Sequence, residues 1–391
     1  MKALTCITTF HRTSCLAVAM LMLIMMSCSK ATIVPQTNVD EQIEVVEGDA
    51  AQVRLCVNLG FSGDTKVSGV DYDRDEKPVR RWAFFIFERV GGSLAYRGSV
   101  DGGAAITKTL RVGTYDIFVV ANQPTTGSHA VNVSSIYTKT QFQGLTSYLE
   151  DNGIGEFVMA GNNTFTVVKS DDVQEVVVRL KRLVSKVCLE SITRDFENAT
   201  LAAKPMSINR VYLTNVAPRT RYYSDLTMDD MTSPSSPYRS VDKNTWYNAM
   251  GWHSDGSMAP NALVDALTQK LDINTPITQG QTVSLNESLY FLPNPMLLSG
   301  DSHDAVWSGP RCTRLVIETV IDGRTYYYQA TLPKDPDDAP IARNSAFGVK
   351  CRLTKPGSTD PEQDIPGVID VTFTALPQTD WDNVYNVTEE S

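Results

Sequence analysis

The chain has few of the residues that enzymes use for acid–base chemistry and metal binding. Its 391 residues include only four histidines: His11, His129, His253 and His303. No two histidines lie one helical turn apart around a glutamate, and there is no Gly-x-Ser-x-Gly elbow or glycine-rich phosphate loop. Two carboxylates could still converge from separate loops for glycoside hydrolysis, although no motif points to them. We therefore expect no enzyme activity and no cofactor. An envelope hydrolase has weak support, because no catalytic constellation emerges from the sequence.

Cysteine is scarce, and no two cysteines have the CxxC spacing of a metal knuckle. Cys6 and Cys15 lie in the first 27 residues, which are predicted to be a signal peptide. Four cysteines lie beyond position 28: Cys56, Cys188, Cys312 and Cys351. Four cysteines allow three disulfide connectivities, which the sequence cannot separate, and cysteines in strand patterns are more often small buried apolar residues.

Metal-binding loops are also lacking. Asp71, Asp73 and Asp75 alternate as in a calcium loop, but Glu76 stands where the sharp turn needs glycine. A second acidic group, Asp335 with Asp337 and Asp338, fits an acidic turn equally well. We expect no metal site at either place.

The chain has only one long apolar run, residues 16–26, which is about half the length that spans a bilayer. It follows a short basic opening and ends at Ser27-Cys28, the arrangement of a lipoprotein signal with a small residue before the acylated cysteine. We predict a signal peptide over residues 1–27, lipidation (palmitate) at Cys28, and attachment to the outer membrane. Ordinary secretion with cleavage nearby is the alternative.

A basic run is absent as well. Lys2 and Arg12 leave with residues 1–27 and no acid does, so the formal charge falls from −10 to −12. An acidic chain without a basic patch excludes nucleic acid and argues against binding to an anionic membrane surface. Removing 27 of the 391 residues leaves 364, more than a single core usually serves, and two domains are expected.

Short alternating segments bounded by glycine, asparagine and proline fill most of the mature chain, the pattern of strands with one buried face. Residues 28–51 are polar and acidic and predict a tether. An N-terminal β-sandwich is predicted over residues 52–183, with strands at 53–59, 82–87, 107–112 and 115–122, and with only 136–152 as a helix candidate.

A C-terminal β-sandwich is predicted over residues 184–391. Strands are expected at 187–189 and 208–216, then a loop-rich stretch over 218–285, then strands at 288–292, 347–354 and 368–375. Asp322-Gly323 predicts a tight hairpin within residues 314–332, because both residues accept positive φ. The fold class is therefore all-β, with two β-sandwich (transthyretin-like) domains and few short helices.

The two ends of the mature chain carry strands of matching pattern. Apolar residues alternate in the first strand, at Val53, Leu55, Val57 and Leu59, and in the last strand, at Ile369, Val371, Phe373 and Ala375. If the first strand left, a sandwich would expose an apolar cleft and open strand edges that pair readily with another chain. The alternative is that both strands simply belong to their own cores.

The order and spacing of several segments resemble the fimbrillins of Bacteroidales, the major and minor pilus subunits made as lipoprotein precursors. The resemblance spans essentially the whole mature chain. Its markers are residues 113–122 (GTYDIFVVAN), 182–189 (RLVSKVCL), 325–327 (TYY), 341–344 (IARN) leading to Phe347, 355–361 (KPGSTDP), and Trp381.

This resemblance implies a subunit of a cell-surface fimbrium that polymerises with other pilin subunits and supports adhesion. An arginine- or lysine-directed protease would cut the loop at Lys66 or Arg74 and release the first strand, and the last strand of another subunit would fill the groove. An uncut, lipidated chain would instead act as an anchor, and the loops of residues 218–285 would suit a tip subunit that adheres to a host or bacterial surface.

The competing interpretation is a surface-anchored glycan-binding lipoprotein. Trp246, Trp252 and Trp307 lie in loop-rich regions, where exposed indole rings could stack on sugars.

Overall fold

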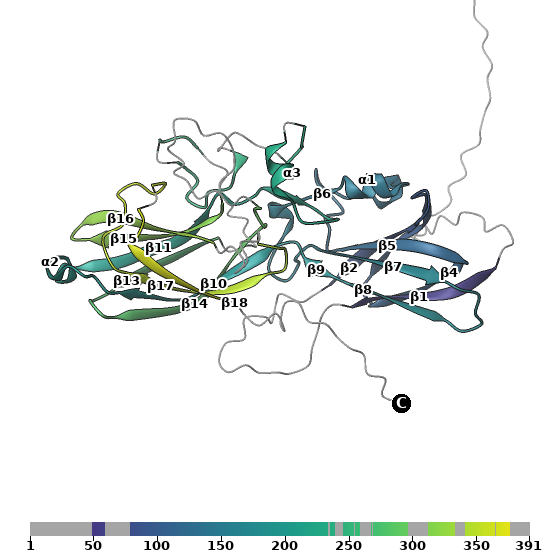
Figure 1. Ribbon diagram of the computed structural model, residues 1–391, viewed down its shortest axis with the longest axis horizontal. Coiled ribbons are helices and arrows are strands. Elements are labelled where there is room, and N and C mark those ends of the chain that lie inside the picture. Colours follow the sequence, from purple (N-terminus) through teal and green to yellow (C-terminus); the bar gives the residue numbers. More distant parts are fainter. Residues whose placement is uncertain are drawn as a thin grey trace, which may run out of the picture. The chain divides into compact units, whose positions relative to one another are not determined.

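A computed structural model describes the fold of the chain over residues 49–58, 79–233, 235–238, 245–253, 255–258, 267, 269–295, 312–332, 341–363 and 365–375. Strands dominate these residues and the helices are short, so the predicted all-β sandwich class is confirmed (Figure 1). None of the described helices has the length and hydropathy of a membrane span.

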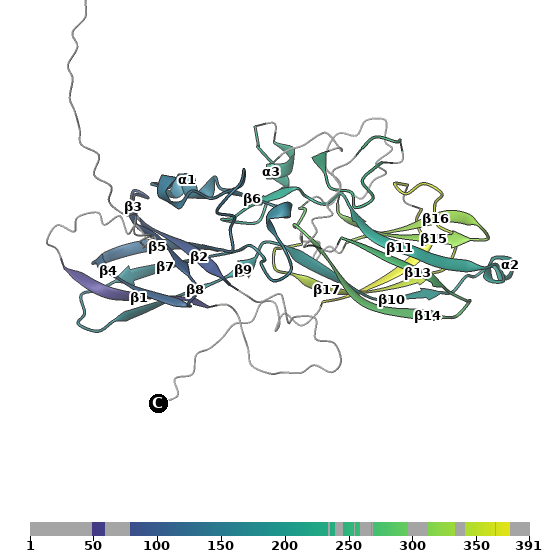
Figure 2. The same cartoon turned by 180° about the vertical axis from the view of Figure 1, so that it is seen from behind.

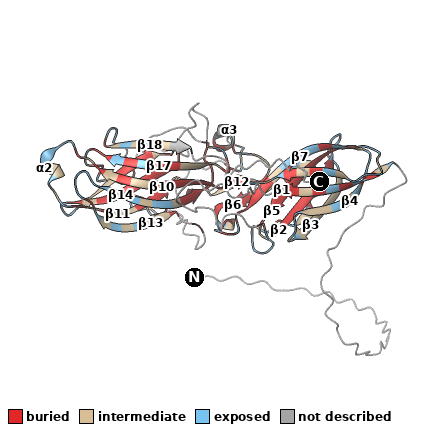
Figure 3. Cartoon of the chain, turned by 90° about the horizontal axis from the view of Figure 1, so that it is seen from below, coloured by how far each residue is buried: buried red, intermediate tan, exposed pale blue. Residues whose placement is uncertain are grey.

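Strands from the first part of the chain form two sheets. One is ordered β4-β1-β8, from Ala105–Arg111, Ala50–Asn58 and Gln174–Arg179. The other is ordered β3-β2-β5-β7-β9, from Leu94–Asp101, Arg81–Glu88, Gly113–Ala121, Met159–Val167 and Lys181–Arg182. Apolar side chains of both sheets belong to one buried core. The buried residues are coloured red on the cartoon in Figure 3.

Strand β2 is covered on both faces, which explains why its sequence is a continuous apolar run. Residues 82–87 of β2 are all fully buried. On one face Phe85 and Phe118 pack against Phe142 of helix α1 (Lys139–Gln143), with ring centroids 5.1 and 4.8 Å apart. Because neither face meets water, β2 has no reason to alternate between apolar and polar residues.

A buried carboxylate ties three elements of this sandwich together. Asp116 of β5 accepts hydrogen bonds from Arg89 at 2.8 Å, from Lys139 of α1 at 2.9 Å and from Thr164 of β7 at 2.6 Å. Burial alone would raise the pKa of Asp116, but these three donors outweigh it and the pKa is lowered.

Strands from the rest of the chain form two four-stranded sheets. The first is ordered β14-β10-β17-β18, from Thr282–Phe291, Ser185–Arg194, Ala346–Leu353 and Ile369–Ala375. The second is ordered β13-β11-β15-β16, from Lys270–Pro276, Met206–Thr214, Arg314–Ile321 and Arg324–Thr331. The division of the chain into domains of residues 52–183 and 184–391 remains a prediction.

The predicted hairpin is confirmed. Strands β15 and β16 pair in register from Arg314 opposite Thr331 to Ile321 opposite Arg324. The turn residues Asp322 and Gly323 have φ of 51° and 81°, as a two-residue hairpin of this type requires.

Two of the segments that resemble fimbrillins, residues 325–327 and 355–361, meet at this hairpin. Tyr327 and Ser358 exchange backbone hydrogen bonds of 2.7 and 2.9 Å. A Cβ on the preceding Gly357 would lie 2.1 Å from the carbonyl oxygen of Tyr327. Glycine is therefore required at position 357 because the two backbones touch there.

The predicted helix over residues 136–152 is mostly wrong. Helix α1 covers only Lys139–Gln143, between the N-cap Thr138 and the C-cap Gly144. Beyond it, β6 (Thr146–Tyr148) pairs with β12 (Arg219–Arg221), and a 3-10 helix follows at Leu149–Asp151. Pairing with a distant strand therefore overrides the local helix pattern. The other short helices are η1 (Val133–Ser135), α2 (Ala199–Ala202) and α3 (Met228–Thr232).

The loop-rich stretch predicted for residues 218–285 also contains strands that sequence reading missed. Strand β13 begins at Lys270 and β14 at Thr282, well before the predicted start at residue 288. Between residues 270 and 285 the apolar residues of these strands are only partly buried and alternate with polar ones that are mostly exposed, a weak signal next to the buried strands of the core.

Candidate functional site

The first strand lies in the middle of its sheet. β1 pairs antiparallel with β4 and parallel with β8 (Figure 2). In this register Leu55 lies between Ile106 and Val176. Its inward side chains are sealed from solvent, with exposed fractions of 0% for Val53, 1% for Leu55 and 4% for Val57. Leu59 lies outside the described residues.

This burial makes β1 a large contributor to the core. Each of Val53, Leu55 and Val57 contributes about 1.5–3 kcal/mol on burial, before chain entropy is counted. A strand that leaves this position must therefore be replaced by one with comparable apolar side chains.

The neighbours of β1 have few other backbone partners. β8 stands at the edge of its sheet, and β1 is its only ladder partner among the described strands. Because β1 is antiparallel to β4 and parallel to β8, these two run in opposite directions. If β1 left, the empty position between β4 and β8 would be a vacated slot. A strand that entered this slot in either direction would form one parallel and one antiparallel ladder.

The last strand is held much more loosely. Among the described strands β18 lies at a sheet edge and pairs with β17 alone, from Leu353 opposite Ile369 to Phe347 opposite Ala375. Its residues Ile369, Val371 and Phe373 are partly buried and alternate with exposed Asp370 and Thr372. The side chain of Ala375 is outside the described residues. β1 and β18 belong to different sheets, so neither is the other's partner within the chain.

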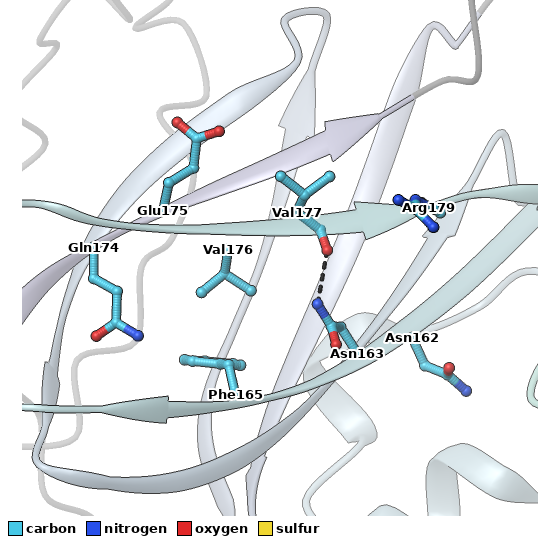
Figure 4. Close-up of a pocket in the computed structure, with 8 residues that line it drawn as sticks. All are labelled: Asn162, Asn163, Phe165, Gln174, Glu175, Val176, Val177 and Arg179. Atoms are coloured by element: carbon cyan, nitrogen blue, oxygen red, sulfur yellow. Dashed lines mark hydrogen bonds between the residues drawn. The ribbon is translucent and has the colours of Figure 1, made fainter. Parts of the chain in front are cut away.

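A cavity of about 480 Å³ lies on the other side of β8, between β8 and β7 (Figure 4). Eight residues line it: Asn162, Asn163, Phe165, Gln174, Glu175, Val176, Val177 and Arg179. Two side-chain amides cross between the strands. Asn163 Nδ2 donates to the carbonyl of Val177 at 2.8 Å, and Gln174 Nε2 donates to the carbonyl of Thr166 at 2.6 Å. Sequence reasoning missed these residues, because an asparagine or glutamine in a polar strand position carries no distinctive signal.

The four cysteines after position 28 form no disulfide with one another. Cys188, Cys312 and Cys351 are buried, and Cys56 on the outward face of β1 is half-buried. Burial raises the pKa of the Cys351 thiol to about 12. Burial, reinforced by the nearby Glu175 carboxylate, raises the pKa of Cys56.

The structure describes two of the three tryptophans proposed to stack on sugars. Trp246 is 2% exposed and belongs to the core, so the expectation that its ring is available to a sugar is wrong. Trp252 is 37% exposed and pairs through a backbone bridge with Met258. Trp307 lies outside the described residues.

Several other predicted positions also lie outside the described residues: Cys28, Lys66, Arg74, Asp71, Asp73, Asp75, Asp335, Asp337 and Asp338. Within the described part of the chain, no three histidine, cysteine or carboxylate side chains gather in a way that could hold a metal ion. His129 and His253 each pair with acidic side chains, His129 with Asp151 and His253 with Glu362.

A scan against models of known families finds no match for this chain, and a search of curated proteins finds none either. Solved structures do share its fold. A fimbrilin of Porphyromonas gingivalis is 14% identical, with a TM-score of 0.57 over 84% of this chain and 97% of its own.

Two further structures are similar at the same level. A candidate cell adhesion protein of Bacteroides eggerthii is 16% identical, with a TM-score of 0.53 over 84% of this chain and 96% of its own. One from Parabacteroides distasonis is 13% identical, with a TM-score of 0.54 over 84% and 97%. At these identities the likeness establishes a shared fold, and the resemblance to fimbrillins is confirmed at that level.

Proposed function

We propose that this chain is a structural subunit of a cell-surface fimbrium that polymerises by strand exchange and supports adhesion. The observation that carries the proposal is the contrast between its two terminal strands. β1 fills the middle of a sheet with buried side chains, whereas β18 is an amphipathic edge strand with one ladder partner in the part of the chain that the structure describes. The fold shared with the P. gingivalis fimbrilin supports the same reading.

In this proposal β1 is the segment that leaves and β18 of a neighbouring subunit is the segment that enters. Val371 and Phe373 of the donor would take the inward positions that Val53 and Leu55 hold in the free subunit. The partners are other pilin subunits, and the joint is made of backbone ladders and apolar burial without catalytic groups or cofactors.

Maturation follows from the same scheme. Residues 1–27 direct export, and lipid on Cys28 with the tether of residues 28–51 holds the precursor at the outer membrane. A cut at Lys66 or Arg74 then separates β1 from the rest of the chain and leads to an extracellular fimbrium. A lipidated chain that is not cut would serve as the anchor of the fibre.

The proposal is tested by changing the donor strand. A chain that lacks residues 368–391 should fold as a monomer that no other subunit extends, as measured by size-exclusion chromatography and electron microscopy. Phe373→Asp should also block extension, because it puts a charge into the apolar slot. The matched control is Thr372→Asp, which changes the neighbouring exposed side chain and should leave assembly intact. Filaments of normal length from the truncated chain would refute the proposal.

A further inference from the structure

The amide contacts between β7 and β8 lie where the sandwich has no backbone ladder. β7 pairs with β5 along its length but with β9 only at Met159 and Ala160. Beyond that point the second edge of β7 faces β8, whose own ladder partner is β1 on the opposite side. Two strand edges therefore face each other across the cavity shown in Figure 4.

Asn163 and Gln174 bridge these edges from opposite directions. The amide of Asn163 reaches from β7 to the carbonyl of Val177 on β8, and the amide of Gln174 reaches from β8 back to the carbonyl of Thr166 on β7. We call the line along which the edges of β7 and β8 face each other the seam. Both carbonyls face this seam, so each side-chain amide supplies the hydrogen-bond donor that a neighbouring strand would have supplied.

The remaining amide atoms fix the orientation of each side chain. Asn163 Oδ1 accepts from the backbone of Thr164 at 2.8 Å, and Gln174 Oε1 accepts from that of Val168 at 3.5 Å. At the end of the seam Gly161 brings the backbones into contact, since a Cβ there would lie 2.1 Å from the carbonyl oxygen of Arg179.

These contacts acquire a role when β1 is absent, an argument that rests on the proposed function. Loss of β1 takes away the ladder of β8 from Gln174 to Arg179. At its far end β8 is still held by the contact of Gly161 with Arg179 and by the ladder of β9 on β7. Along the rest of its length, what holds it is the packing of Val176 and Val178 and the two amides. Apolar packing alone does not define strand register, whereas hydrogen bonds at fixed backbone positions do.

We propose that Asn163 and Gln174 are positioning residues for strand exchange, which keep β8 aligned on β7 so that the vacated slot retains its second edge. The same side chains occupy the seam between β7 and β8. An incoming strand can therefore pair with the other edge of β8, at the position of β1.

The experiment uses the full chain cut at Lys66 or Arg74, between β1 and β2 in sequence, mixed with a labelled peptide of residues 366–376. Peptide binding is followed by fluorescence anisotropy, and hydrogen exchange of residues 174–179 is followed by mass spectrometry. The double variant Asn163→Ala with Gln174→Ala is compared with Asn162→Ala, which changes an exposed asparagine lining the same cavity.

We expect the double variant to bind the peptide about tenfold more weakly and to exchange β8 amides about tenfold faster than wild type, because it loses two hydrogen bonds. Asn162→Ala should behave like wild type. Before the cut, the double variant should melt close to wild type, since β1 then supplies the ladder.

Three outcomes would overturn the proposal. One is equal peptide affinity and equal β8 exchange in the double variant and wild type. A second is an equal loss in Asn162→Ala. A third is a double variant that unfolds with β1 in place, because the amides would then stabilise the sandwich in general. If wild type takes up no peptide, strand exchange itself fails, and β8 exchange in the cut chain still decides whether the amides hold the strand.

Discussion

Arg182 and Asn344 are 162 positions apart in the sequence and meet through the side-chain oxygen of Asn344. That oxygen accepts from the backbone nitrogen of Arg182 at 3.1 Å and from its guanidinium at 3.3 Å. Asn344 also donates its backbone N–H to the carbonyl of Val184 at 3.0 Å and has a left-handed φ of 63°. Two segments that marked the resemblance to fimbrillins are thus halves of one contact at the start of β10.

Replacing Asn344 by alanine should destabilise the chain by about 2–4 kcal/mol, since it leaves the buried N–H of Arg182 without its acceptor and puts alanine in the left-handed region. The control is Asn274→Ala, an exposed position with a similar φ of 47°. It should cost only about 1–2 kcal/mol, the conformational part. Equal losses in urea denaturation would show that the contact contributes nothing.

Acid should weaken the chain partly through Asp116. Its pKa is lowered in the fold, so its contribution to stability is complete above the unfolded value of about 3.9 and is lost as pH falls through the folded value. Asp116→Asn should lower stability by about 1–3 kcal/mol at pH 7 and flatten the decline below about pH 4. Asp101→Asn, at an exposed site, should do neither. Chemical denaturation at several pH values measures both, and an unchanged acid slope in Asp116→Asn would contradict this account.

The cysteines should differ in reactivity. Cys351 is buried and its pKa is raised to about 12, whereas Cys56 is half-buried on the outward face of β1. Alkylation requires an accessible thiolate. Iodoacetamide at pH 8 should therefore modify Cys56 at least about tenfold faster than Cys351, as followed by mass spectrometry. Both should react in the denatured chain, and equal rates in the folded chain would disprove the burial argument.

Digestion with a trypsin-like protease should cut first within residues 62–81, which contain Lys66 and Arg74. The reason is that this polar, charged stretch joins two strands that are themselves held in ladders. Mass spectrometry of early time points identifies the first cut. Cleavage elsewhere while this stretch stays intact would reject the prediction.

Local patterns predicted the features that depend on neighbours in sequence. Asp322-Gly323 indicated the turn between β15 and β16, and the alternation of Val53, Leu55 and Val57 indicated a strand with one buried face. Where pairing with a remote strand decides the conformation, local reading failed. Residues 146–148 looked helical and instead form β6 against Arg219–Arg221.

For the candidate site, too, the sequence predicted local patterns and not the pairing of distant segments. The sequence showed that both terminal strands are amphipathic. It did not show that β1 lies between β4 and β8 or that β18 lies at an edge, because strand order depends on contacts across the whole chain. Nor could it show that Trp246 is buried or that the amide of Asn163 reaches Val177.

By itself the sequence determined the all-β class, the shortage of catalytic and metal-binding motifs, and the matched apolar faces of the two ends. Periodicity and composition are properties of neighbouring residues and can be read without a fold. Only the tertiary structure decided which strand is enclosed and which is exposed at an edge, because burial and ladder partners exist only once distant segments have paired.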